Sequence, residues 1–407
     1  MKVTIMSNDQ LLTEATPENE AQYFRRDIQG LRALAVILVI LAHAKVANFA
    51  GGYIGVDIFF VISGFVITGL LLRQSGQNVV RQLGTFYARR IRRIRPAATL
   101  VIIGTLVAAF YWIGPFSAQP LLADARWASG FWANFHFITV GTDYFSQGLP
   151  PSLILHYWSL AVEEQFYFVF PLVLFVTAAL FGLRRHRVIL SVFLGILVAA
   201  SAIWSAYETT RNPVAAYYSP FTRFWELGFG ALLAALPPTL KIKNDRQVQV
   251  GQWASIVIIL AAATKLTDTS HVPGVLTWWA VAPAGFLLWT GGSTSLAFPS
   301  GWFSKQPLRY IGDISYSLYL FHFAWLNIPV QYVLLKYGET NNLSVRSRVE
   351  QIVGALICAA LSYEFFENPI RRSKVLDRRP WLTGLLGAGL IGLVWLSAWL
   401  IQTYWTL

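Results

Sequence analysis

The stretch Phe24–Thr68, FRRDIQGLRALAVILVILAHAKVANFAGGYIGVDIFFVISGFVIT, decides the fold of this chain. It holds two apolar spans, 31–49 and 53–72, joined by a glycine-rich bend. Arg32 at the entrance of the first span and His43 far inside it are 11 residues apart. A helix places side chains at this spacing on one face, about 16 Å apart along its axis. Because ionisable groups inside a bilayer need a buried polar cavity, the stretch predicts a site within the membrane.

The composition indicates a chain that crosses a membrane many times. Of its 407 residues, 55% are apolar, 15% are aromatic and only 13% are charged, and the mean hydropathy is +0.51. These values are typical of a polytopic membrane protein rather than of a soluble domain with one anchor. The sequence therefore predicts an all-α fold, a polytopic transmembrane helical bundle of about ten core spans plus one extra C-terminal span. The candidate spans are 31–49, 53–72, 97–113, 157–182, 188–206, 221–236, 251–267, 275–292, 308–335, 349–366 and 381–404.

The basic residues predict the orientation of the bundle. With the N-terminus in the cytoplasm, the segments on the cytoplasmic side hold 24 of the 32 basic residues, as the positive-inside rule expects. The polar residues 1–23 then form a loose cytoplasmic tail, and Leu407 lies on the far side. The net charge of +12 would suit nucleic acid, but the basic residues cluster in short loops between apolar spans. The expected partner is therefore the lipid bilayer, and no nucleic acid.

An arginine-rich run, RRIRRIRPAA (Arg89–Ala98), lies at the predicted inner end of the third span. Its arginines can anchor a helix at the interface or contact anionic lipid. The spacing also favours a phosphate site, because arginines three residues apart share a helix face and present two planar guanidinium groups. The two pairs with this spacing are Arg89/Arg92 and Arg90/Arg93. A nucleotide-bearing ligand from the cytoplasm is the predicted partner.

Acidic residues lie inside predicted spans, where a carboxylate needs a partner, a proton or water. In LHYWSLAVEEQFYFVF these are Glu163 and Glu164, which can pair with an arginine of another span or orient a catalytic imidazole. Asp57 is a further catalytic candidate of this kind. Arg223 and Glu226, three residues apart in a later span, are expected to satisfy each other.

Histidine and aromatic residues supply the remaining candidates. The predicted outer loop, about 114–156, mixes aromatic and small polar residues, which suits a sugar and equally an interfacial aromatic belt. The substrate-binding candidates are His156, Trp158, Tyr319 and His322. The sequence has no serine-hydrolase elbow, zinc motif or phosphate-binding glycine loop, so no metal is expected. The single cysteine, Cys358, lies in an apolar run and forms no disulfide framework.

Several segments resemble, in the same order, the acyltransferase 3 family of integral membrane acyltransferases. The resemblance is strongest to bacterial O-acetyltransferases that act on lipopolysaccharide O-antigens and related glycans. It covers residues 24–372, which we expect to form one transmembrane domain. The matching segments are RDIQGLRALAVILVILAHA, GGYIGVDIFFVISGFVIT, the arginine run before IRPA, LHYWSLAVEEQFY, RFWELGFGALLA, ISYSLYLFH and FENPIRR.

Two motifs of the family fall on residues already singled out. The Arg/Lys-x10-His motif of the family falls on Arg32 and His43. Its Arg-x-x-Arg motif fits Arg90 and Arg93 best, because isoleucine and proline follow as in the family. The bare spacing also fits Arg89 and Arg92.

The resemblance implies transfer of an acetyl group from cytoplasmic acetyl-CoA, a co-substrate, to a hydroxyl of an extracytoplasmic glycan or glycolipid at a bacterial inner membrane. Lipopolysaccharide O-antigen is the expected acceptor. His43 would act as general base or as a transient acyl carrier. Arg32 would bind a phosphate of the donor or hold the site open electrostatically, and the arginine run would bind the donor phosphates. Glu163 or Glu164 would orient the imidazole or balance its charge.

The sequence departs from the family core at its C-terminal end. Residues 373–407 are predicted to form a linker and an extra span, Trp381–Thr403. In related proteins such a helix leads into an extracytoplasmic SGNH-type domain, so either a chain without that domain or a truncated one is expected. Two other functions stay open: a transporter or flippase that uses the intramembrane charges, and acylation of a small lipid or antibiotic.

Overall fold

The computed structural model describes residues 25–73, 79–145, 150–237, 240, 242, 244–291, 299–338 and 344–404, with the side chains of 181–186 and 300 excepted. The predicted tail, residues 1–23, lies outside the described residues. All regular structure in the described residues is helical. The elements are α2 (Arg26–His43), η1 (Ala50–Ile54), α3 (Gly55–Arg73), α4 (Val79–Trp112), α5 (Pro115–Ala118), α6 (Pro120–Ser129), α7 (Ala133–Thr139), α8 (Tyr157–Arg211), α9 (Pro213–Tyr218), η2 (Pro220–Thr222), α10 (Phe224–Ala235), α11 (Asp245–Lys265), η4 (Val275–Thr277), α12 (Trp278–Thr290), α13 (Ser300–Phe303), α14 (Leu308–Asp313), α15 (Ser315–Tyr337), α16 (Val345–Ser362), η5 (Tyr363–Glu367), α17 (Asn368–Arg371), α18 (Lys374–Arg378) and α19 (Pro380–Tyr404).

The apolar helices correspond to the predicted spans. In the described residues, 8 helical segments are long and apolar enough to cross a membrane, and Phe224–Ala235 and Val275–Thr290 are shorter apolar helices. The first predicted span corresponds to α2, whose 18 residues include the charged side chains of Arg26, Asp27 and Arg32. The prediction of an all-α, multi-pass transmembrane bundle is therefore confirmed.

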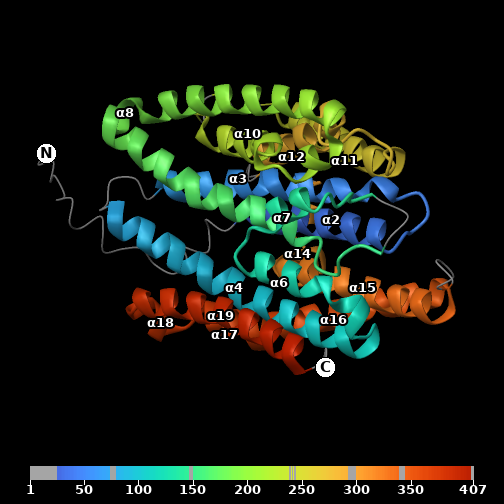
Figure 1. Ribbon diagram of the computed structural model, residues 1–407. Helices are drawn as coiled ribbons and strands as arrows, with labels where there is room; N and C mark the ends of the chain where they lie inside the picture. The colour runs from blue at the N-terminus through green and yellow to red at the C-terminus, as the bar shows by residue number, and fades with distance from the viewer. Residues whose placement is uncertain are drawn as a thin grey trace, which may run out of the picture.

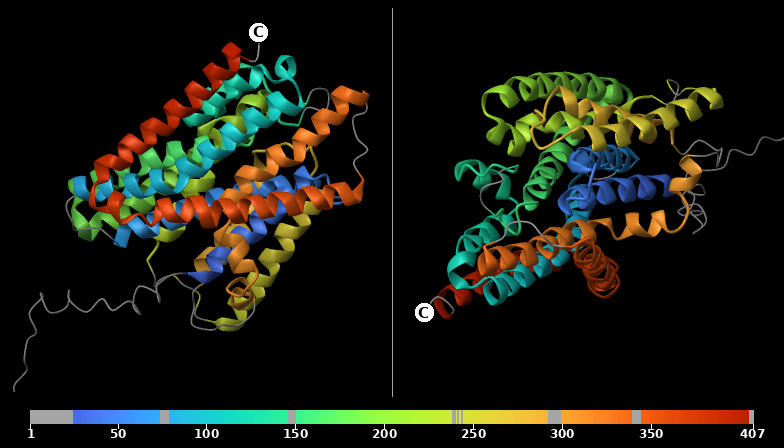
Figure 2. Two further views of the ribbon diagram at one scale, coloured as in Figure 1. Left: turned by 90° about the horizontal axis from the view of Figure 1, so that it is seen from below. Right: turned by 90° about the vertical axis from the view of Figure 1, so that its right-hand side faces the viewer.

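The central pair of the bundle is α2 and α3, which pack against each other. On one side of this pair lie α10, α11, α12 and the second half of α8, and on the other side lie α4, α15, α16 and α19 (Figure 1). The view along the bundle in Figure 2 shows the same two groups separated by the central pair. Because α3 packs against α10 and α12 while α2 packs against α15, the central pair can bring residues from both groups together.

The longest helix, α8, supplies two spans. It has 55 residues, and a straight helix of that length would measure about 80 Å, far more than a bilayer. Figure 1 shows α8 folding back at a sharp bend. Its two apolar segments, Tyr157–Leu180 and Arg187–Arg211, match the predicted spans 157–182 and 188–206.

Three predicted spans have different limits in the structure, and the span 97–113 is the C-terminal half of α4, which begins at Val79. The span 31–49 was predicted to hold His43 far inside, but α2 ends at that residue. The helix cannot continue because Lys45 and Asn48 adopt left-handed backbone angles, with φ of 51° and 68°. The long predicted span 308–335 is divided into the short α14 and the membrane-length α15.

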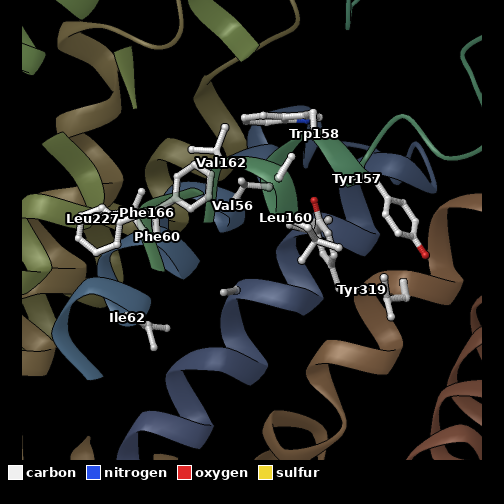
Figure 3. Close-up of a cluster of buried hydrophobic side chains, with 14 of the residues drawn as sticks. Val56, Phe60, Ile62, Tyr157, Trp158, Leu160, Val162, Phe166, Leu227 and Tyr319 are labelled. Atoms are coloured by element: carbon white, nitrogen blue, oxygen red, sulfur yellow. The ribbon is translucent and has the colours of Figure 1, made fainter. Parts of the chain in front are cut away.

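A buried hydrophobic cluster joins α3, α8, α10 and α15 (Figure 3). Within it, the rings of Phe60 and Trp158 meet edge to face with centroids 6.1 Å apart. The hydroxyl of Tyr157 donates a hydrogen bond of 2.9 Å to the carbonyl of Ala98, which ties α8 to α4.

By contrast, α16 and α19 expose large apolar side chains along their outer faces. These include Val353, Ile357, Leu361, Leu385, Leu396 and Leu400. Such a face is suited to contact with lipid.

Gly64 of α3 and Gly230 of α10 allow these two helices to approach closely. A Cβ atom on Gly64 would overlap the carbonyl oxygen of Leu227, and one on Gly230 would overlap that of Val61. We expect Gly64→Leu to destabilise the protein by about 1–3 kcal/mol or more, because overpacking forces the backbones apart. Thermal unfolding in detergent measures the effect. Gly104→Leu is the matched control, since no atom lies within 4 Å of its added Cβ, and equal stability of the two variants would contradict the close contact.

Candidate functional site

A cavity of about 630 Å³ lies between α2, α3, α4, α8 and α15, and α10 and α12 also contribute to its wall. Its lining includes Arg73 at the end of α3, Arg187 in the second half of α8 and Pro237 after α10. These residues belong to helix ends on the predicted cytoplasmic side, so the cavity reaches that side. In the opposite direction it extends to Ser159 and Tyr319, near the predicted outer end of the first half of α8.

Positive charge dominates the cavity wall. The charged residues that line it are Arg25, Arg32, Arg73, Arg90, Arg93, Arg187, Glu163 and Glu164. Within the described part of the chain, none of Arg32, Arg90 and Arg93 forms an ion pair. Arg32 donates to the side-chain oxygen of Gln29 at 3.3 Å, and the guanidinium of Arg90 lies 3.8 Å from the ring centroid of Tyr167. Arginines in such a partly enclosed site attract an anion strongly.

The two candidate arginine pairs face different surroundings. Arg90 and Arg93 line the cavity, whereas Arg89 is exposed and lies outside it. Arg92 is buried and forms an ion pair with Asp377 of α18, so its charge is already balanced. Along α4, the structure therefore places one pair in the cavity and leaves Arg89 and Arg92 out.

Glu163 and Glu164 line the cavity but do not contact His43. Glu163 accepts a hydrogen bond of 2.6 Å from the hydroxyl of Ser63 and a second one from the hydroxyl of Tyr167. One carboxylate oxygen of Glu164 is buried and has no hydrogen-bond partner in the described residues. The predicted contact of these glutamates with the imidazole of His43 is absent from the described residues. The carboxylate of Glu163 is bonded instead to the hydroxyl groups of Ser63 and Tyr167.

His43 is held by a tyrosine on one side and by a histidine on the other. Its Nε2 atom lies 2.7 Å from the hydroxyl of Tyr144, in the predicted outer loop. Its Nδ1 atom lies 3.1 Å from Nε2 of His322 on α15. Burial raises the pKa of the Tyr144 hydroxyl above its usual value, so this group stays protonated at neutral pH and can donate to the imidazole.

Tyr319 links the end of the cavity to these histidines. Its hydroxyl bonds to the hydroxyl of Ser159 at 2.7 Å and donates to the carbonyl of His156 at 3.2 Å. Its ring centroid lies 5.3 Å from that of His322. His156, with Nε2 3.1 Å from the carbonyl of Leu320, completes a cluster of three imidazoles next to the end of the cavity.

Asp57 and Trp158 lie apart from the cavity arginines. Arg223 donates to Asp57 at 2.8 Å and to Glu226 at 3.1 Å, so all three charges are buried together. The guanidinium also lies over the rings of Trp158 and Tyr217, 5.1 and 4.8 Å from their centroids. Asp57 therefore belongs to a buried ion-pair network, and Trp158, only 1% exposed, is a packing residue rather than an open platform for a sugar.

The structure adds residues that the sequence analysis did not select. Tyr144 was only one of several loop aromatics, and no spacing rule connects it with His43. Tyr217 stacks on Tyr144 with centroids 4.5 Å apart and so supports it. Tyr167, by contrast, lies four residues after Glu163, a helical spacing that predicts contact between the two side chains.

The arrangement suits acyl transfer between ligands that arrive from opposite sides. An anion can enter the arginine-lined cavity, and on the loop side the Nε2 atom of His43 meets a hydroxyl group, that of Tyr144. A partly buried imidazole that accepts a hydrogen bond from a hydroxyl is in the geometry of a general base. The described residues contain no cluster of metal-ligating side chains.

Comparison with known proteins places this site in a family. The acyltransferase domain family matches residues 25–367. The chain is 32% identical to the peptidoglycan O-acetyltransferase OatA of Listeria monocytogenes over 361 residues, which cover 86% of this chain and 56% of that protein. It is 31% identical to the O-acetyltransferase OatA of Staphylococcus aureus over 354 residues, which cover 85% and 57%.

The chain spans about half the length of the curated relatives it matches. No solved structure matches it. The family match extends from the start of α2 to the end of η5 and so includes every helix that lines the cavity. By this match and by the two relatives, the chain belongs to the acyltransferase 3 family of membrane O-acyltransferases.

Proposed function

We propose that the cavity binds acetyl-CoA from the cytoplasmic side and that the protein transfers the acetyl group to a hydroxyl of an extracytoplasmic glycan. The observation that carries this proposal is the position of Arg32, Arg90 and Arg93 in one cavity that extends to Tyr319, next to the imidazoles. The phosphates of the donor would pair with these arginines. Its pantetheine arm would follow the apolar wall formed by Val56, Phe59, Phe60 and Leu160.

In this proposal His43 acts as the general base. Its Nε2 atom takes the proton of the acceptor hydroxyl while the oxygen attacks the thioester carbonyl. The carbon–sulfur bond then breaks, and the thiolate of CoA takes the proton from the imidazole, so atoms and charges balance. His43 is the last residue of α2, and the partial negative charge at a helix C-terminus stabilises a protonated imidazole. The ring of Tyr319 would turn aside to admit the thioester.

A glycan of the bacterial cell envelope is the proposed acceptor. The Listeria relative is named for peptidoglycan, so we place peptidoglycan ahead of the lipopolysaccharide O-antigen that the sequence resemblance suggested. The Tyr144 hydroxyl that donates to His43 lies where an acceptor hydroxyl would sit. A sugar that displaces it would present its own hydroxyl to the same nitrogen.

The proposal is tested with purified protein in nanodiscs. We expect saturable binding of acetyl-CoA and release of CoA that depends on an added glycan, with a soluble peptidoglycan fragment and an O-antigen oligosaccharide compared as acceptors. In proteoliposomes, acetyl-CoA supplied on one face should acetylate a glycan on the other. Movement of an intact glycan-lipid without loss of the thioester would instead identify a transporter or flippase.

A further inference from the structure

The hydrogen bonds around His322 determine which nitrogen of His43 carries a proton. Nδ1 of His322 lies 2.6 Å from the carbonyl oxygen of Tyr319. A carbonyl oxygen only accepts, so this Nδ1 must be the donor. In a neutral imidazole the other nitrogen, Nε2, is then an acceptor, and its partner at 3.1 Å is Nδ1 of His43. His43 therefore carries its proton on Nδ1 and keeps its lone pair on Nε2.

The lone pair of His43 points to the side from which we expect the acceptor. Its Nε2 atom receives the hydroxyl hydrogen of Tyr144 at 2.7 Å. The whole chain runs from the Tyr319 carbonyl through His322 and His43 to Tyr144, and each member has one consistent donor and acceptor assignment. With the opposite tautomer of His43, two N–H groups or two lone pairs would face each other at one of these contacts.

We infer that His322 is a positioning residue for His43: together with the backbone of Val39, which also hydrogen-bonds to the imidazole, it fixes the tautomer that presents a basic Nε2 to the acceptor hydroxyl. The inference rests on the proposed function and assigns to a histidine the role that the sequence analysis gave to a glutamate. When His43 gains a proton, its Nδ1–H still donates to Nε2 of His322, which stabilises the positive charge. Because His322 is neutral, it does so without adding a buried negative charge.

A purely packing role for His322 would not need this geometry. The side chain is fully buried, with 0% exposure, and its ring lies 6.0 Å from that of Phe323 and 5.5 Å from that of His156. An apolar side chain of similar size would satisfy those ring contacts. Both of its nitrogens are instead engaged, one by its own helix and one by His43.

The test compares His322→Gln with His322→Leu in nanodiscs. A glutamine carbonyl reaches about as far as Nε2 and accepts from Nδ1–H of His43, whereas leucine fills space without an acceptor. We expect His322→Leu to lower kcat for CoA release about 100-fold while the Kd for acetyl-CoA stays unchanged. His322→Gln should recover most of that loss. His271→Gln, at an exposed histidine, is the matched control and should behave like wild type.

A second measurement does not depend on activity. Nitrogen-15 NMR of the histidine side chains reports the tautomer directly, and we expect the Nδ1–H form of His43 in wild type and a mixture of tautomers in His322→Leu. Wild-type rates in His322→Leu, or a His43 proton on Nε2 in wild type, would overturn the inference. If wild type itself neither binds acetyl-CoA nor releases CoA, the proposed function fails, and the NMR result still decides the tautomer.

Discussion

His43→Ala should bind acetyl-CoA as tightly as wild type and release CoA at least about 1,000-fold more slowly, which is within the range for loss of a general base. Donor affinity and the rate of CoA release should change independently, because His43 does not line the cavity. The groups proposed to hold acetyl-CoA do line it. Removing the imidazole leaves the Tyr144 hydroxyl and the His322 Nε2 without their shared partner. Donor affinity by equilibrium binding and CoA release by a thiol assay measure both quantities on one preparation.

The outcome also distinguishes the two chemical roles left open for His43. If His43 carried the acyl group, wild type incubated with labelled acetyl-CoA and no acceptor would retain label on the protein, and His43→Ala would retain none. With direct transfer neither protein retains label. His271→Gln is again the matched control. Undiminished CoA release by His43→Ala would contradict both roles.

The sequence predicted the membrane helices well because apolar span length is a local property. The spans 157–182 and 188–206 correspond to the two apolar segments of α8, Tyr157–Leu180 and Arg187–Arg211. The predicted limits of a span were less accurate where the backbone conformation ends a helix. The apolar run around His43 continues to Phe49, but the left-handed backbone at Lys45 ends the helical path.

The partners in the site could be predicted only where they share a helix. Spacing grouped Arg90 with Arg93 and equally Arg89 with Arg92, and of these two pairs only Arg90 and Arg93 lie in the cavity. His43 and His322, by contrast, are separated by 279 residues along the chain, so no local pattern connects them. Glu163 was expected near His43 because a buried carboxylate needs a partner. Its hydrogen-bond partners are instead hydroxyl groups, that of Ser63 among them. A hydroxyl donor satisfies a buried carboxylate as well as an imidazole donor would.

Arg90→Ala/Arg93→Ala should weaken acetyl-CoA binding about 100-fold, because each charge-assisted hydrogen bond to a phosphate contributes about 1.5 kcal/mol. The proposed proton transfer takes place at His43 and not at these arginines, so kcat at saturating acetyl-CoA should change far less than the affinity for acetyl-CoA. Binding of acetyl-CoA and of its 3′-dephospho analogue to both proteins, arranged as a double-mutant cycle, measures whether these arginines hold the 3′-phosphate. Equal losses for both donors would place them on the pyrophosphate instead.

Arg89→Ala is the control and is compared with Arg90→Ala alone, because each removes one positive charge from the same helix and Arg89 is exposed and outside the cavity. We expect the donor affinity of Arg89→Ala to match wild type at physiological salt, where exposed charges are screened. Arg92→Ala is unsuitable, since it would break the ion pair between the buried Arg92 and Asp377 and so change stability. Equal weakening by Arg89→Ala and by Arg90→Ala would mean that the whole arginine run acts through its net charge. The cavity would then not be the donor site. A site that binds phosphates by direct hydrogen bonds must lose more affinity when an arginine of its lining is removed than when Arg89, which lies outside it, is removed.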